Sequence, residues 1–212
     1  RANENPREQA YVDAVAARYS ESGDDRATLD RAYADAMAKL VAAYPDDLDA
    51  ATLYAESLMD LMPWDYYQKD GTPKPETQIM LAQLERVMAK TMEHPGALHF
   101  YIHAVEATKT AKRGEPAADA LADLVPVAGH LVHMPSHLYL RVGRYHDAVV
   151  ANELAASADE DYIAQCNAQG FYPASYYPHN LHFLWYALAM EGQKQKSIEA
   201  AGPMDDRGSK WT

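Results

Sequence analysis

The histidines of this chain are concentrated in one region and are spaced like metal ligands. All nine lie within residues 94–182. His99 and His103 are four residues apart, and His133 and His137 repeat this spacing. Residues four apart lie on one face of an α-helix, so each pair can direct two imidazoles to one point. Because imidazole is a common ligand of Zn, Cu, Fe and Ni, the spacing predicts a transition-metal site.

The two histidine pairs are also related to each other along the chain. They are separated by about 34 residues, which is one period of a common helix-pair repeat. His130 and His133 recur as His179 and His182 after one period plus an insertion. Neighbouring packed helices lie only about 8–10 Å apart, so the pairs can converge. We predict a metal ion, Zn first and Cu, Fe or Ni as alternatives. Its predicted ligands are His99, His103, His133, His137 and His182.

Other polar residues are predicted to lie near this metal. Glu106 follows His103 by one helical turn, and Glu56 lies four residues before Asp60 on an earlier helix. A carboxylate beside a metal can transfer protons, so Glu106 and Glu56 are the candidate catalytic residues. Arg141 could bind an anionic group, although an ion pair with Glu106 or another acid is its favoured role. The further residues predicted to line the groove are His130, His179, Arg141, Tyr101 and Asp60.

Several of these residues have simpler interpretations. A buried histidine is commonly a hydrogen-bonded core residue, and duplication of a repeat would copy a pair without any function. His94 is predicted to cap a helix, and His146 to lie on the surface. Pro135 either kinks the helix of the second pair or begins it. Cys166 lies in a predicted loop with no basic neighbour, so we expect an unreactive thiol.

The elements that must position these residues are predicted to be helices almost throughout. Apolar residues recur at three- and four-residue steps, and alternating β-branched runs are absent. Short connections favour antiparallel neighbours. Two longer loops are predicted, WDYYQKDGTPKP and FYPASYYP. The predicted helices cover residues 5–20, 25–45, 48–63, 76–95, 96–110, 117–126, 133–142, 144–159 and 179–190, and a last one begins near 193.

The segment SHLYLRVGRYHDAVVANELA resembles a tetratricopeptide repeat. Gly143, Tyr145, Ala148 and Ala155 fall where that repeat turns and packs its two helices. The strings YAESLMDLMPWD, HPGALHFYIHAVE, AGHLVHMPSHLYL and YYPHNLHFLWYALAMEG are similar to those of a bacterial group of tetratricopeptide-repeat proteins. The resemblance implies an all-α fold, an α-α superhelix of stacked antiparallel helix pairs. It also implies further repeats on both sides, so we expect one TPR-like domain over residues 1–212, a fragment of a longer protein.

Composition excludes several classes of partner. The formal net charge is −12 and the isoelectric point is about 5.1, so the chain repels phosphate backbones and anionic membrane surfaces. We therefore expect no nucleic acid and no membrane as a partner. A single cysteine permits neither an intramolecular disulfide nor a cysteine-based zinc site. The opening RANENPREQA has no initiator Met and no apolar signal core, so a cytoplasmic and an exported location both stay open.

Two functions fit these residues. The first is a TPR-like scaffold whose His-rich concave groove binds a peptide or protein segment and a transition metal. The second is a metal-dependent enzyme, a hydrolase or an oxidoreductase, that uses the same groove. The scaffold is preferred because the sequence shows no complete set of catalytic residues, and a fold alone does not establish a reaction.

Overall fold

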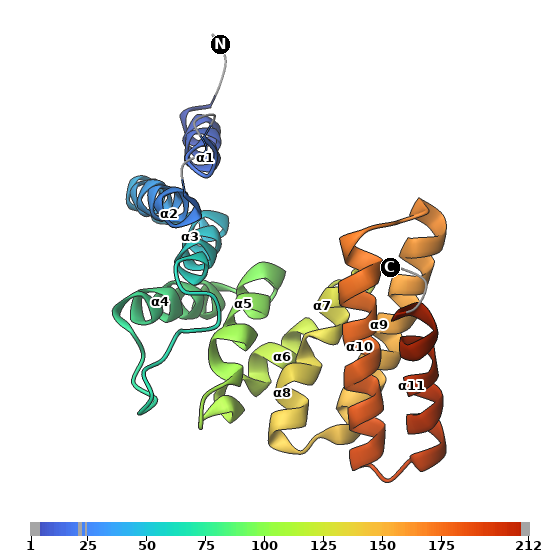
Figure 1. Cartoon of the computed structure of the whole chain (residues 1–212). Coiled ribbons are helices and arrows are strands. Elements are labelled where there is room, and N and C mark those ends of the chain that lie inside the picture. The colour runs from blue at the N-terminus through green and yellow to red at the C-terminus, as the bar shows by residue number, and fades with distance from the viewer. Residues whose placement is uncertain (1–4, 21–22, 24, 209–212) are drawn as a thin grey trace. The chain divides into compact units, whose positions relative to one another are not determined.

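The structure is a computed structural model, and it describes residues 5–20, 23 and 25–208. Within these ranges the protein is helical, and the only β pairing is an isolated bridge between Tyr67 and Pro73. The all-α prediction is therefore confirmed. The elements are α1 (Pro6–Ala16), α2 (Arg26–Ala43), α3 (Leu48–Asp60), α4 (Pro75–Lys90), α5 (Pro95–Glu106), the 3₁₀ helix η1 (Ala111–Gly114), α6 (Glu115–Leu121), α7 (Gly129–His133), α8 (Pro135–Val142), α9 (Tyr145–Cys166), α10 (Phe171–Met190) and α11 (Lys194–Gly208) (Figure 1).

The chain forms two compact units, and the boundary between them falls within α5. The first unit is Arg1–Phe100 and the second is Tyr101–Thr212. In the first unit each helix packs on its chain neighbour, α1 on α2, α2 on α3 and α3 on α4. A buried apolar cluster there contains Ala14, Tyr33, Met37, Leu40 and Ala50. The single repeat domain over the whole chain stays a prediction.

Local side-chain chemistry explains where several helices begin. The Asn5 side chain accepts a hydrogen bond from the backbone N–H two residues on, and Asp25 and Asp47 cap α2 and α3 by accepting from the backbone N–H three residues on. His94 Nδ1 accepts from the backbone N–H of Ala97 at 3.2 Å, at the start of α5. The capping role predicted for His94 is therefore confirmed.

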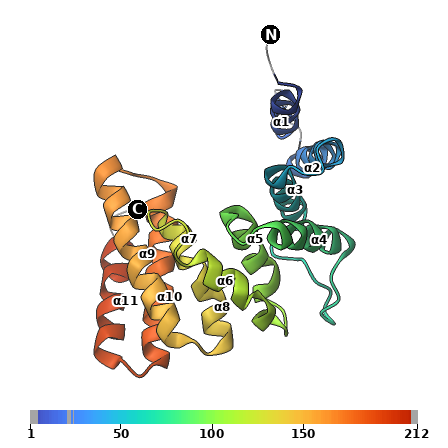
Figure 2. The same cartoon turned by 180° about the vertical axis from the view of Figure 1, so that it is seen from behind.

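The second unit is organised around α9. Helices α7, α8 and α10 all pack against α9, and α10 also packs against α7 and α11 (Figure 2). The buried face of α9 is rich in alanine, which allows close approach of neighbouring backbones. The close approach of α7 to α9 requires a glycine at position 129. A Cβ there would lie 2.0 Å from Asp159 Oδ1 and 2.9 Å from the Ala155 carbonyl oxygen. This contact fixes α7, whose last residue is His133.

Replacing Gly129 with alanine is expected to destabilise the protein by about 1–3 kcal/mol, because the new methyl group has no space unless α7 and α9 separate. Urea unfolding followed by circular dichroism measures this change. Gly202→Ala is the matched control, since nothing lies within 4 Å of its added Cβ and alanine favours a helix. Equal stability of the two variants would contradict the close packing of α7 on α9.

One predicted loop in the second unit is wrong. The Tyr/Pro-rich segment FYPASYYP forms the first half of α10, and Pro178 lies inside that helix. Pro173 is in the first turn, where a missing N–H is tolerated. The cost of Pro178 is offset by packing, because Tyr177 is 1% exposed and its hydroxyl donates to Glu160. The loop predicted around Cys166 is also wrong, since α9 ends at this exposed residue. In both places tertiary contacts override local turn propensity.

Pro135 is the first residue of α8, and α7 ends two residues earlier. Met134, between them, keeps helical dihedral angles of φ −50° and ψ −39°. The His137 N–H donates to the Met134 carbonyl at 3.2 Å, three residues back, so the turn is tighter than an α-turn. The two interpretations of Pro135 therefore combine, since the residue begins a helix and tightens the path that joins it to α7. His133 and His137 stay one turn apart.

Candidate metal centre

Three imidazoles from three helices meet in the interior of the second unit. His133 ends α7, His137 lies on α8 and His179 lies on α10. The ring centroid of His133 is 4.8 Å from that of His137 and 4.7 Å from that of His179. Phe183 touches all three rings at 4.6–4.7 Å and forms an apolar wall. His133 is fully buried, His137 is 9% exposed and His179 is partly exposed.

The Nε2 atoms of these three residues are spaced as the ligands of one metal ion would be. His137 Nε2 lies 3.0 Å from His133 Nε2 and 3.4 Å from His179 Nε2. Nitrogen ligands at 2.0–2.1 Å from a tetrahedral Zn²⁺ are about 3.3 Å from one another. The three residues also have ligand atoms that all lie within 4.8 Å of one another. This group, which we call the His₃ centre, could therefore hold a metal ion.

Asn152 determines which nitrogen of His133 carries the proton. Asn152 Nδ2 donates to the Ala148 carbonyl at 2.7 Å, so its Oδ1 is the acceptor that faces His133 Nδ1 at 2.6 Å. His133 Nδ1 must then be protonated. Burial, reinforced by the nearby His137, lowers the pKa of His133 well below its ordinary value, so the ring is neutral. The lone pair of His133 therefore lies on Nε2 and points into the His₃ centre.

Glu106 plays the same part for His137. Its carboxylate accepts from His137 Nδ1 at 2.6 Å and from His103 Nδ1 at 2.8 Å. Burial raises the pKa of Glu106, but the hydrogen bonds from the two histidines outweigh burial and lower this pKa to about 2. Since the ionised carboxylate only accepts, His137 Nδ1 carries a proton. A carboxylate that holds the second nitrogen of a ligating histidine is a common support of metal sites.

Two lone pairs consequently face each other in the His₃ centre. When both Nδ1 atoms donate, no N–H lies between the Nε2 atoms of His133 and His137, which are 3.0 Å apart. A metal ion bound by the Nε2 atoms would relieve the repulsion between their lone pairs.

A second set of ligand atoms, from His103, Glu106 and His137, could also hold a metal ion. In this set the two Nδ1 atoms already donate to the two carboxylate oxygens. Its charges and protons are therefore satisfied without a metal. The His₃ centre is the stronger candidate because only there do the hydrogen bonds leave lone pairs opposed.

His179 and its neighbours His130 and His103 are also held in the neutral form. Burial, with smaller effects from neighbouring histidines, lowers the pKa of His130 and of His179 to about 4. Burial also lowers the pKa of His103. The His130 ring lies 6.2 Å from the His133 ring and contacts Tyr176 at 4.7 Å. Since neutral imidazole is the form that binds metals, burial prepares this region for an ion.

The predicted ligands are only partly brought together. His103 lies beside the His₃ centre, and His179, predicted only to line the groove, supplies the third imidazole. His182 does not join them, because α10 turns it outwards, where it is exposed and its ring stacks on Trp185 at 5.5 Å. His99 belongs to the first unit.

The predicted acidic groups of the earlier helix have a different local role. Glu56 and Asp60 lie in the first unit, where they bind Arg18 at 3.2 and 2.7 Å. Burial and the charge of Asp60 raise the pKa of Glu56. They form a local ion-pair group around one arginine.

Arg141 and Tyr101 lie in the second unit. Arg141 is exposed and donates to the Thr108 carbonyl at 3.4 Å, and among the described residues no ion pair joins it to Glu106 or to another acid. Glu106 is instead engaged by two histidines. Tyr101 is buried, and Arg113 stacks over its ring at 5.9 Å.

Sequence reasoning missed Asn152 and Phe183. Asn152 is a polar residue on the alanine-rich buried face of α9, and such an exception on an apolar face is a signal for a buried hydrogen bond. Phe183 lies one turn after His179 on α10, so the shared helix face was the available signal.

Comparisons of this chain with protein-family models, curated proteins and solved structures find no match. Among the described residues, none of the helices combines the length and the apolar character that crossing a membrane requires.

Proposed function

We propose that this protein binds one transition-metal ion through the Nε2 atoms of His133, His137 and His179. The observation that carries the proposal is the pair of opposed lone pairs on His133 and His137, 3.0 Å apart. Asn152 and Glu106 hold the Nδ1 protons that create this arrangement. The protein thereby supplies both the ligands and the partners that orient them.

Zn²⁺ is the ion that fits best. It accepts imidazole nitrogen at 2.0–2.1 Å in tetrahedral geometry, and the Nε2 separations of 3.0 and 3.4 Å agree with that geometry. Cu²⁺, Ni²⁺ and Fe²⁺ also bind imidazole and are the competing ions. Three protein ligands leave one position of a tetrahedron open.

The open position supports a second candidate function, a metal-dependent hydrolase or oxidoreductase. Catalytic zinc sites have this three-ligand form, whereas structural sites have four protein ligands. Glu106 does not fit the proton-transfer role in that function, because both of its oxygens accept hydrogen bonds from histidines. Glu106 instead orients the His137 ring. We therefore place metal binding ahead of catalysis as the proposed function.

The wider function that we propose is that of a TPR-like scaffold. Support comes from the packing of successive helices on their chain neighbours within each unit. Gly143, with φ 82°, makes the left-handed turn between α8 and α9 at the position where the repeat usually turns. In this proposal the partner is a peptide or protein segment in the concave groove. The metal would link α7, α8 and α10 and so stiffen the surface presented to that partner.

Metal loading tests the proposal directly. Untagged protein, stripped with a chelator and dialysed, is titrated with Zn²⁺ and then analysed for zinc after gel filtration. We expect one tightly held ion per chain, and the same in His146→Ala, since His146 is exposed and pairs with Glu191. Protein that retains no zinc would contradict metal binding.

A further inference from the structure

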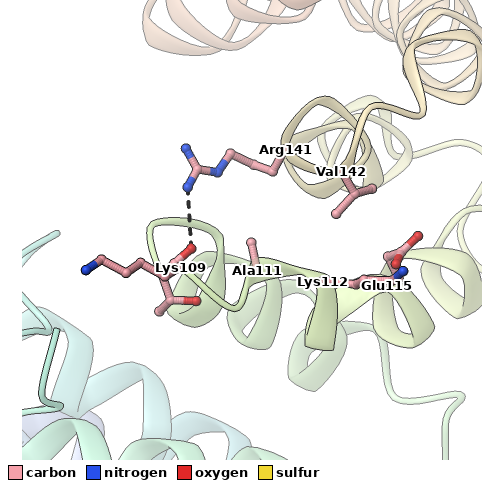
Figure 3. Close-up of a pocket in the computed structure, with 7 residues that line it drawn as sticks. Lys109, Ala111, Lys112, Glu115, Arg141 and Val142 are labelled. Carbon is pink, nitrogen blue, oxygen red and sulfur yellow. Dashed lines mark hydrogen bonds between the residues drawn. The ribbon is translucent and has the colours of Figure 1, made fainter.

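A second feature of this unit is a cationic pocket about 300 Å³ in volume. Its charged lining consists of Lys109, Lys112 and Arg141 with one acid, Glu115, and it lies between η1 and the end of α8 (Figure 3). Cations are scarce in this chain, which carries a formal net charge of −12. Three of them around one pocket therefore form a local exception to the acidic surface.

The pocket is lined by three cations and one acid, so its formal charge is positive. Within the described ranges, no ion pair involves Lys109, Lys112 or Arg141. The acid of the lining, Glu115, lies 3.5 Å from Arg144 Nη1 and is partly compensated by it. Exposed cations in water need no partner, but their convergence on one hollow raises the local potential for an anion.

Arg141 is oriented in a manner that suits an anion. Figure 3 shows its side chain extending from α8 toward the turn that follows α5, where Nη2 donates to the Thr108 carbonyl at 3.4 Å. That contact uses one of the five N–H groups of the guanidinium. The remaining groups keep the planar fork that binds carboxylate and phosphate oxygens in pairs.

We propose that this pocket binds the phosphate or carboxylate group of a small molecule. Arg141 provides the two-pronged hydrogen bond, and Lys109 and Lys112 provide the additional charge. The volume is at the lower limit of small-molecule pockets, which hold about 300–1,000 Å³, and so suits a compact anion. None of the three ligands of the His₃ centre lines this pocket, so the proposal does not rest on metal binding.

The test uses metal-free protein in low salt, with inorganic phosphate and acetate as separate probes. The chelator is dialysed away first, because it is itself a polycarboxylate. Titration is followed by the amide NMR signals of residues 108–115 and 141–142. We expect saturable binding of one phosphate or acetate per chain. If phosphate binds more tightly than acetate, the ligand carries a phosphate group. If acetate binds as tightly as phosphate or more tightly, the ligand carries a carboxylate.

Three variants separate a built site from general attraction. Arg141→Gln is expected to weaken anion binding about tenfold or more, because it removes one charge-assisted pair of hydrogen bonds. Arg141→Lys keeps the charge without the fork and should be intermediate. Arg113→Gln removes a cation of η1 that does not line the pocket, so it should change binding little. The proposal would be overturned if the amide chemical shifts changed linearly with anion concentration and did not saturate. Equal losses of anion affinity in Arg141→Gln and Arg113→Gln would also overturn it.

Discussion

Replacing His137 with alanine is expected to lower the affinity for Zn²⁺ by more than about a hundredfold. Loss of a partner that only supports a ligand costs about 10- to 100-fold in metal affinity, and loss of a ligand itself should cost more. His137 is central because its Nε2 is the atom nearest to both of the other ligands, at 3.0 and 3.4 Å. Competition with a zinc-binding dye measures the change.

Two companion variants give this measurement its controls. Asn152→Ala removes the acceptor that fixes the proton on His133 Nδ1, so the affinity should fall by about 10- to 100-fold. His146→Ala removes an exposed histidine of α9 and should leave affinity unchanged. Circular dichroism must show that each variant is folded, because His137 and Asn152 are both buried. An affinity of His137→Ala equal to that of His146→Ala would disprove the His₃ centre.

Saturating Zn²⁺ is expected to raise the free energy of unfolding at pH 7.5 by about 4 kcal/mol when its free concentration is a thousand times its dissociation constant. The ion binds three helices that are brought together only in the folded chain. Protons compete for the same nitrogens, so this stabilisation should shrink as the pH falls toward 5.

The metal-free protein should also lose stability over this pH range. Burial lowers the pKa of His130 and of His179 from 6.5 to about 4, so the folded state binds fewer protons than the unfolded state between these values. Stability from these residues is present above pH 6.5 and is lost as the pH falls below it. His130 alone accounts for roughly 2 kcal/mol between pH 7.5 and pH 5. The contribution of His179 is smaller, because it is more exposed to solvent.

Thermal unfolding at pH 7.5, 6.5, 5.5 and 5, with Zn²⁺ and with chelator, separates the two effects. The acidic surface is a competing influence, since protonation of crowded carboxylates stabilises the protein over part of the same range. That influence is common to both series, so the difference between them reports the metal alone. A melting temperature that Zn²⁺ does not change at pH 7.5, in protein shown to have bound the ion, would mean that the metal is not coupled to folding.

The sequence alone was sufficient to predict the helical class and one half of the site. Periodic apolar residues, helix caps such as Asn5 and Asp47 and the prolines at helix starts are local signals, because helix formation depends on residues within one or two turns. The pairing of His133 with His137 is of the same kind, since four residues make one helical turn. The prediction failed at FYPASYYP, where packing of Tyr177 stabilises a helix despite Pro178.

Only the tertiary structure decided which residues complete the site. His179 and His182 are both on α10, and the way α10 packs on α7 and α9 turns the first inward and the second toward solvent. The partners Asn152 and Glu106 reach their histidines from α9 and α5, and their identity depends on how four separate helices pack. The proton positions, and hence the opposed lone pairs of His133 and His137, follow from those contacts. No spacing in the sequence carries this information, because hydrogen bonds between helices depend on distances across the fold rather than along the chain.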